Sequence, residues 1–211
     1  MDNGKIVADL ANIRAGLILK NKFLSSLFAA NKFRIVKSRV SDDVLITVKN
    51  LSISYQSKGF FKHVQRDIIN NLSFSLFRGE TLGILGSSGS GKSTIARAIL
   101  RLQESSGDIS YENILISGLE YKKMKLLRRD LQIIYQDPAA SLNPKMTIYE
   151  IIREGMQAHN INNHDEIIND LLVEVGLNSS FLLRYARQMS GGEKQKVAIA
   201  RALCLMPKFI I

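Results

Sequence analysis

The chain has 211 residues, of which 45% are hydrophobic, enough for the core of one domain with some residues left over. Its single cysteine, Cys204, excludes an internal disulfide framework and a Cys-x-x-Cys metal site, and we expect it to fill space in the core of a protein from a reducing compartment. No apolar run approaches the roughly 18 residues that a membrane-spanning helix needs. The net charge of +10 raises the question of nucleic-acid binding, but Lys and Arg are spread along the whole chain, so we expect solvated faces and no nucleic-acid partner.

The first segment, residues 9–39, is basic and has apolar residues at helical spacing. The pattern predicts one or two amphipathic helices on the surface, with a helix lying on a membrane as the alternative. Lys20 interrupts its longest apolar stretch, which argues against a targeting signal. The residues at helical spacing within 9–39 are Leu10, Ile13, Leu17, Leu24, Leu27 and Phe28.

Further along, we expect residues 56–67 to form a loop between two strands.

Residues 80–100, ETLGILGSSGSGKSTIARAIL, predict a phosphate-binding loop. Leu82–Leu85 suit a buried parallel strand, Ile95–Leu100 suit a helix, and the pattern GxxxxGK[ST] lies between them. Such a loop turns backbone N–H groups toward phosphate, while Lys92 adds a charge and Ser93 a hydroxyl for Mg²⁺. The alternative is a glycine-rich turn without a ligand, which the flanking strand and helix disfavour. The loop consists of Gly86, Ser87, Ser88, Gly89, Ser90, Gly91, Lys92, Ser93 and Thr94.

After the loop, the pattern predicts a short apolar strand, which is followed by Gln136, Asp137 and Pro138. Two amphipathic helices follow, within 146–160 and 165–177, the second stopped by Gly176. Their apolar positions are Ile148, Ile151, Ile152, Ile168, Leu171, Leu172 and Val175.

Two histidines flank the polar turn between these helices, and the start of a third helix follows further along the chain. We expect His159 and His164 to be surface residues rather than metal ligands, since no cysteine or carboxylate accompanies them at ligand spacing. Ser190, beside Gly191 and Gly192, suits the N-cap of a further helix. Residues 209–211 read as the start of a buried strand.

Phosphate loop, glutamine and SGG motif in this order resemble the nucleotide-binding domain of ABC transporters. The stretch QDPAASLNPKM is similar to the importer group for oligopeptides, dipeptides and nickel. The resemblance covers about residues 44–211. It implies an α/β P-loop NTPase core with a small antiparallel β part and an inserted helical subdomain at about 146–186. The cofactors that it implies are ATP and Mg²⁺.

The resemblance also implies roles for individual residues. Tyr55 matches the aromatic side chain that stacks on adenine, although an ordinary packed strand tyrosine is the alternative. Gln136 matches the glutamine that approaches Mg²⁺ and the attacking water, and it joins Ser93 as a metal contact. A signature matches the residues that contact ATP held by an opposite domain; it comprises Ser190, Gly191, Gly192, Glu193 and Gln195.

The implied partners are a second nucleotide-binding domain, transmembrane permease subunits that dock on the helical subdomain and, indirectly, a substrate-binding protein. The implied location is peripheral, on the cytoplasmic side of the bacterial inner membrane. Two departures from the family pattern stand near the signature. Glu193 occupies a position that often holds glutamine, and Ala186-Arg187 replaces a common Pro-His. Neither removes a group that ATP binding needs.

The sequence ends at Ile211, where the family pattern continues into an Asp-Glu pair and a histidine loop. We therefore expect a C-terminally incomplete domain that does not hydrolyse ATP alone. Residues 1–7 and 19–33 are similar to the hairpin and helix near the end of such a domain. This suggests that residues 1–43 are an extension or linker carrying the tail of a preceding domain; an ordinary gene start upstream of Met1, with no phosphate loop before it, would contradict that.

Two alternatives remain open at the level of sequence. A non-transport ABC protein acting on DNA or ribosomes shares the phosphate loop and the signature, although QDPAASLNPKM and the short helical part argue against it. The chain could also be an inert or split-gene fragment of a transport ATPase.

Overall fold

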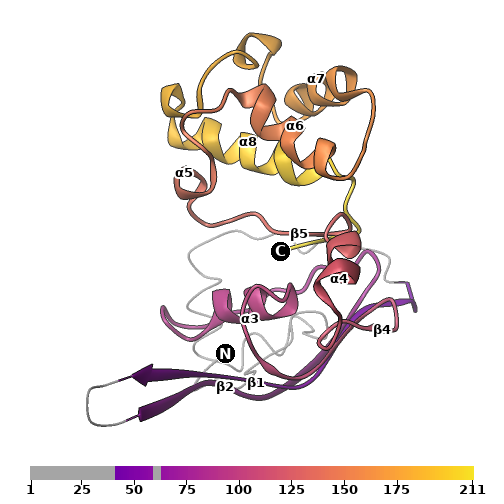
Figure 1. Cartoon of the computed structure of the whole chain (residues 1–211), viewed down its shortest axis with the longest axis vertical. Helices are drawn as coiled ribbons and strands as arrows, with labels where there is room; N and C mark the ends of the chain where they lie inside the picture. The colour runs from indigo at the N-terminus through magenta and orange to yellow at the C-terminus, as the bar shows by residue number, and fades with distance from the viewer. Residues whose placement is uncertain (1–40, 59–62) are drawn as a thin grey trace, which may run out of the picture. The chain divides into compact units, whose positions relative to one another are not determined.

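The structure, a computed structural model, describes residues 41–58 and 63–211 (Figure 1). The chain divides into two compact units, Met1–Leu119 and Glu120–Ile211, and each is described by itself. The helices expected within residues 9–39 lie outside the described residues, as does most of the expected 1–43 extension.

The first unit is built on an antiparallel sheet with the strand order β2-β1-β3-β4. In β1 (Val44–Lys58), Ile46 and Val48 are buried, while Thr47 and Lys49 are more exposed. A register shift follows, with Asn50 at a φ of 53°, so that Leu51 and Ile53 continue the buried row. A one-residue irregularity of this kind moves the alternation by one position and keeps the apolar row on the core side. The other strands are β2 (His63–Phe77), β3 (Ser106–Tyr111) and β4 (Ile114–Leu115).

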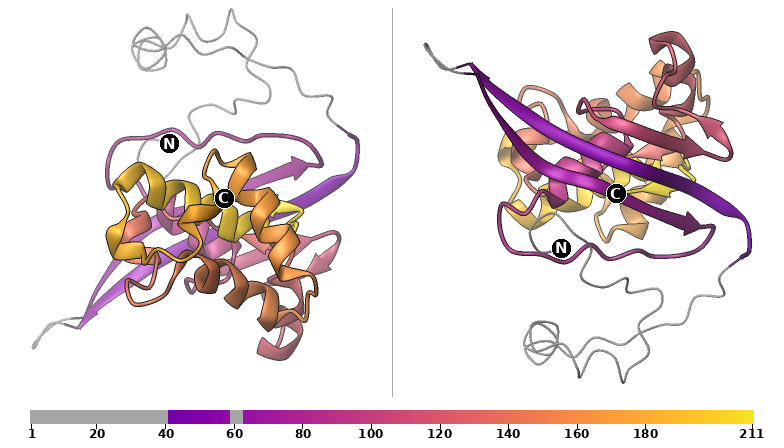
Figure 2. Two further views of the ribbon diagram at one scale, coloured as in Figure 1. Left: turned by 90° about the horizontal axis from the view of Figure 1, so that it is seen from above. Right: turned by 90° about the horizontal axis from the view of Figure 1, so that it is seen from below.

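The loop expected at 56–67 is wrong for most of its length. β1 and β2 continue their pairing through Gln56 with Gln65 to Lys58 with His63, and only residues 59–62 lie outside the described part. Seen from below, the two strands form one long twisted ribbon (Figure 2). The backbone ladder of a hairpin propagates through polar positions that have weak strand propensity, because pairing rather than composition decides the conformation there.

Helix α3 (Lys92–Ile99) lies on one face of the β1–β2 ribbon and confirms the predicted helix (Figure 1). It buries Ile95, Ala98 and Ile99. The strand predicted at Leu82–Leu85 is absent: these residues are half-buried, and none of them pairs with a strand in the described part of the chain. An apolar run shows that a segment is suited to burial, but a strand also needs a hydrogen-bonded neighbour.

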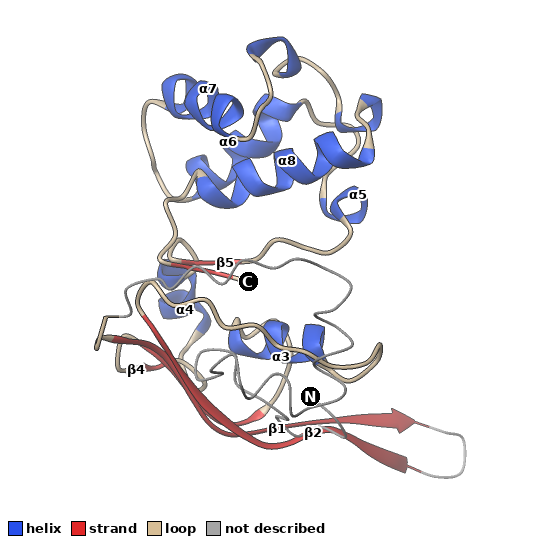
Figure 3. Cartoon of the chain, turned by 180° about the vertical axis from the view of Figure 1, so that it is seen from behind, coloured by secondary structure: helices blue, strands red, loops and turns tan. Residues whose placement is uncertain are grey.

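The second unit is mainly helical (Figure 3). Its main helices are α6 (Ile148–Ala158), α7 (His164–Glu174) and α8 (Gly191–Leu203), which confirm the predicted helices. Gly176, at a φ of 70°, follows the end of α7 as expected. Shorter elements are α4 (Tyr121–Leu127), α5 (Pro138–Ser141), and the 3₁₀ turns η2 (Ser179–Phe181) and η3 (Ala186–Gln188).

One hydrophobic core joins α6, α7 and α8. It extends from Leu142 to Leu205, so it contains the expected subdomain at 146–186 and also takes in α8. Cys204 belongs to this core, as predicted, and burial raises the pKa of its thiol to about 12. No helix in the described residues is both long and apolar enough to cross a membrane. Core side chains without exposed surface include Ile148, Ile152, Met156, Ile168, Leu172, Val197 and Ala200.

The two histidines are half-buried rather than fully exposed surface residues. His159 follows α6 and His164 begins α7. Burial lowers the pKa of His159, and the charges of Arg129 and Lys125 lower it further. The described residues hold no group of three or more His, Cys, Asp or Glu side chains suited to a metal ion.

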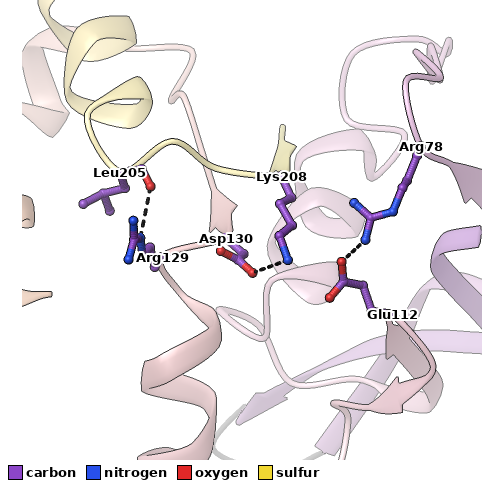
Figure 4. A network of polar contacts seen from close by, with 6 residues as sticks. All are labelled: Arg78, Glu112, Arg129, Asp130, Leu205 and Lys208. Carbon is purple, nitrogen blue, oxygen red and sulfur yellow. Dashed lines mark hydrogen bonds and ion pairs between the residues drawn. The ribbon is translucent and has the colours of Figure 1, made fainter.

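Two predicted short strands, one before the helical core in the sequence and one after it, pair with each other. β5 (Leu131–Gln132) and β6 (Phe209–Ile210) are parallel, with Leu131 beside Phe209. The Nζ of Lys208 lies 3.4 Å from Asp130 Oδ2, and Arg129 Nε donates to the Leu205 carbonyl (Figure 4). These contacts fix the chain that leaves α8. In the first unit, Arg78 pairs with Glu112 in the turn between β3 and β4 (Figure 4).

Replacing Ile152 by alanine tests the helical core. Ile152 has no exposed surface, so Ile152→Ala should lower the free energy of unfolding by about 2–5 kcal/mol through lost burial and a residual cavity. Urea unfolding followed by circular dichroism measures the change. Val173 on α7 is 71% exposed, and Val173→Ala should change stability by less than about 0.5 kcal/mol. Equal losses in both variants would contradict this packing.

Candidate nucleotide-binding site

The predicted phosphate loop has two glycines in a conformation that other residues rarely adopt. Gly89 has a φ of 78° and Gly91 a φ of 92°. The Ser90 N–H donates to the Ser87 carbonyl at 3.2 Å, which tightens the turn between them. A Cβ at Gly91 would lie 2.9 Å from Ile68 Cγ2 and from Ile69 Cδ1 of β2. Only glycine therefore allows the loop to approach the sheet this closely.

The start of α3 is open to an anion. Gly91 is its N-cap and supplies no capping side chain, and the first turn contains no acidic residue. In the described part of the chain, the N–H groups of residues 91–94 meet no hydrogen-bond acceptor. Unsatisfied N–H groups together with the positive end of the helix dipole favour a phosphate oxygen at this position.

Lys92 lies folded across the same loop. Its Nζ donates to the carbonyl oxygens of Gly86 at 2.8 Å and Ser87 at 2.7 Å, and lies 3.4 Å from Ser90 Oγ. The loop thus holds a positive charge beside its free N–H groups. An anion that enters the loop meets both.

Tyr55 lies on β1 with 43% of its surface exposed, and its hydroxyl donates to Gln103 Oε1 at 3.1 Å. The sheet connects it to the phosphate loop: Ile69, which limits the space at Gly91, pairs with Ile53, two positions before Tyr55. The first unit therefore contains a partly exposed ring on β1 and, close to the paired strand β2, the phosphate loop.

Gln136 is exposed in the second unit, between β5 and α5. Asp137 caps α5 by accepting hydrogen bonds from the N–H groups of Ala139 at 2.9 Å and Ala140 at 3.3 Å. At its other end, the carbonyl of Ser141 accepts from Arg201 Nη1 on α8 at 2.6 Å. The segment after Gln136 is therefore held to α8.

Ser190 caps α8, as predicted, and forms a closed pair with Glu193. The Glu193 Oε2 atom accepts from the Ser190 N–H at 2.7 Å and from the Ser190 hydroxyl at 2.8 Å. The Glu193 N–H donates in return to Ser190 Oγ at 3.3 Å. Hydrogen bonds from the Ser190 backbone and side chain lower the pKa of Glu193, and the charges of Arg184 and Lys196 lower it further.

The two glycines of the signature are exposed, and a Cβ at either Gly191 or Gly192 would meet nothing within 4 Å. Gln195 is half-buried one turn along α8. The structure thus groups the predicted residues into two sets. Tyr55 and residues 86–94 belong to the first unit, and Gln136 and the signature belong to the second.

Sequence reasoning missed three contacts that shape these sites: Lys92 on the loop carbonyls, Tyr55 on Gln103, and Arg201 on Ser141. Nothing in the local sequence indicates them, because each pair is formed by folding. The bond between Ser190 and Glu193 did have a signal, since Ser-x-x-Glu before an apolar helix is a capping-box pattern.

A family profile described as "ABC transporter" matches residues 69–211. The oligopeptide transport ATP-binding protein OppF of Streptococcus mutans is 45% identical over 172 residues, which cover 79% of this chain and 55% of OppF. The uncharacterized ABC transporter ATP-binding protein YejF of Escherichia coli is 33% identical over 227 residues, covering 98% of this chain and 43% of YejF. The chain spans about half the length of the curated relatives that it matches.

Among solved structures, a dimeric post-hydrolysis state of the ATP-binding cassette MJ0796, bound to ADP and phosphate, matches with a TM-score of 0.70 and 27% identity. The match covers 79% of this chain and 72% of the MJ0796 chain.

The two glycines with positive φ, Gly89 and Gly91, give a matched test of the loop. Gly89→Ala should cost about 1–2 kcal/mol because of its positive φ, and nothing lies near the added Cβ. Gly91→Ala bears the same strain and also meets Ile68 and Ile69, so it should cost about 1–3 kcal/mol more. Urea unfolding of the two variants measures the difference. Identical losses would show that the loop does not lie against β2 as described.

Proposed function

The chain belongs to the ABC transporter family, and we propose that it binds MgATP as the ATP-binding component of a peptide-type importer. The open first turn of α3 carries the proposal, because free N–H groups, a lysine ammonium and the absence of acidic side chains together suit a polyphosphate. The relative OppF is named an oligopeptide transport ATP-binding protein, which supports the choice of solute class.

The proposed ATP contacts are residues 86–94 for the phosphates and Tyr55 for the adenine ring. The exposed Ser93 hydroxyl offers one oxygen to Mg²⁺. This fits a metal that enters with the nucleotide, since Mg²⁺ keeps few protein ligands and takes the rest from phosphate and water. Gln136 is proposed as a further Mg²⁺ and water contact, and its exposure after β5 leaves its amide accessible.

The proposed partners follow from the two groups of site residues. Ser190, Gly191, Gly192, Glu193 and Gln195 would contact ATP held by a second nucleotide-binding domain, and the dimeric state of MJ0796 supports this arrangement. The helical unit would dock on transmembrane permease subunits, with a substrate-binding protein acting on those subunits. The proposed location is peripheral, on the cytoplasmic side of the inner membrane.

We propose that hydrolysis needs groups beyond these 211 residues. The phosphate loop binds and orients the nucleotide, but in-line attack on the γ-phosphate also needs a carboxylate that holds the metal and a base for the water. The family supplies these from an Asp-Glu pair after the strand that begins here at Phe209.

We also propose that residues 1–43 carry the tail of a preceding nucleotide-binding domain. The match to YejF supports this, because it covers 98% of the chain and so includes most of that segment. The alternative functions, in DNA repair or translation or as an inert or split-gene fragment, find no support in relatives that are named as transport ATP-binding proteins.

Removing the lysine charge tests ATP binding. Lys92→Ala should weaken binding of a fluorescent ATP analogue in the presence of Mg²⁺ by at least about tenfold, because the ammonium no longer meets the phosphates. Fluorescence titration measures the dissociation constant. Lys122→Ala removes an exposed lysine from α4 and should leave affinity unchanged. Equal affinities for wild type and Lys92→Ala would overturn the proposal.

Measuring phosphate release tests whether residues 1–211 bind MgATP without hydrolysing it. A polypeptide of residues 1–211 should bind MgATP yet release phosphate no faster than its Lys92→Ala variant, since the acidic pair is not among its residues. A coupled phosphate assay measures steady-state release. Turnover that Lys92→Ala abolishes would contradict this proposal.

A further inference from the structure

The hydroxyl of Ser190 in the signature already donates a hydrogen bond to a residue of its own helix. A serine hydroxyl has one hydrogen to donate. In this structure the Ser190 hydroxyl donates to Glu193 Oε2 at 2.8 Å, so the hydrogen that would be given to a phosphate oxygen points to a carboxylate instead. The same carboxylate oxygen holds the Ser190 N–H at 2.7 Å.

Glu193 also places a negative charge beside the Ser190 hydroxyl, the group that is proposed to contact ATP. The hydrogen bonds from Ser190, with Arg184 and Lys196 nearby, keep the pKa of Glu193 below its ordinary value. The carboxylate is therefore ionised at neutral pH. Gly191 and Gly192 leave the space around the helix start open, so no side chain of theirs separates an incoming phosphate from this charge.

We infer that Glu193 is a positioning residue that restrains ATP-dependent pairing of two copies of this chain, because its carboxylate must release the Ser190 hydroxyl before the signature can hold a γ-phosphate. The inference rests on the proposed binding of ATP between one copy's phosphate loop and the other's signature. It revises the role of Glu193 within the proposed signature: its carboxylate restrains the contact that Ser190 would make with ATP.

Glutamine at this position removes the competition without removing the cap. Its Oε1 atom accepts the Ser190 N–H in the same capping geometry, as Ser-x-x-Gln does in other helices. Its amide carries N–H donors and no charge, so it can donate toward Ser190 Oγ and leave the hydroxyl hydrogen free. Glu193→Gln should therefore favour the dimer.

The structure offers a matched control. Thr147 and Glu150 form the same closed pair at the start of α6, with Glu150 Oε2 accepting from Thr147 N at 2.7 Å and from Thr147 Oγ1 at 3.0 Å. Hydrogen bonds from Thr147 also lower the pKa of Glu150. Glu150→Gln makes the same chemical change in a capping box outside the proposed ATP contacts.

The experiment measures MgATP-dependent dimerisation by sedimentation velocity for wild type, Glu193→Gln and Glu150→Gln. The dimer contains two such contacts, so Glu193→Gln removes two repulsions between unit charges. Each is worth about fivefold at a separation of about 4 Å in water, so the dimer dissociation constant should fall by about thirtyfold. Glu150→Gln should leave it unchanged. The advantage of Glu193→Gln should shrink when the ionic strength rises from about 0.05 M to about 1 M, where the Debye length is about 3 Å.

The outcomes separate this inference from the proposed function. Binding of the fluorescent ATP analogue, measured on the same samples, should be equal in wild type and Glu150→Gln, because Glu150 lies outside the proposed ATP contacts. If wild type binds no ATP analogue, the proposed function fails and the inference with it. If ATP binds but Glu193→Gln shows no gain in dimerisation, the same gain as Glu150→Gln, or a gain that salt does not reduce, only the inference is overturned.

Discussion

The unpaired N–H groups at the start of each helix are the constraint on which both predicted binding surfaces depend. The first turn of any helix has N–H groups without an internal acceptor, and each helix must satisfy or expose them. Helix α6 closes its first turn with Thr147 and Glu150, and α8 does so with Ser190 and Glu193. Helix α3 has no such cap. The uncapped start of α3 lies in the phosphate loop, and the neighbouring elements hold that loop in position.

Those supports are specific. Ile68 and Ile69 of β2 leave room at Gly91 for a hydrogen atom but not for a methyl group, so the sheet sets the position of the loop. Tyr55 lies on the strand paired with β2. In the second unit, Arg201 of α8 holds the carbonyl end of α5, and α5 begins directly after Gln136 and Asp137. The signature helix and the segment after Gln136 are thus joined by a half-buried side chain.

The sequence predicted best where a local rule determines the structure. The amphipathic spacing gave α6 and α7, Gly176 marked the end of α7, and Ser190 marked the start of α8. The sequence predicted poorly where strand pairing determines the conformation. Leu82–Leu85 were predicted as a strand but have no strand neighbour in the described residues. The polar positions near Gln56 and Gln65 were predicted as a loop but continue a hairpin. The residues of the proposed site could be named from the sequence because phosphate binding needs glycine and lysine at a fixed spacing. The contacts of Lys92 and Arg201 could not be predicted from the sequence, because their acceptors are carbonyl groups that only folding brings near.

A phosphate site at the start of α3 is tested most directly by observing which backbone N–H groups respond to nucleotide. In a ¹H–¹⁵N NMR titration with MgATP, the largest amide shifts should occur in residues 89–94, at the open start of α3. The capped start of α6, around Thr147 and Glu150, should show none. Saturable shifts elsewhere, with residues 89–94 unchanged, would contradict the claim that this helix end is the phosphate site.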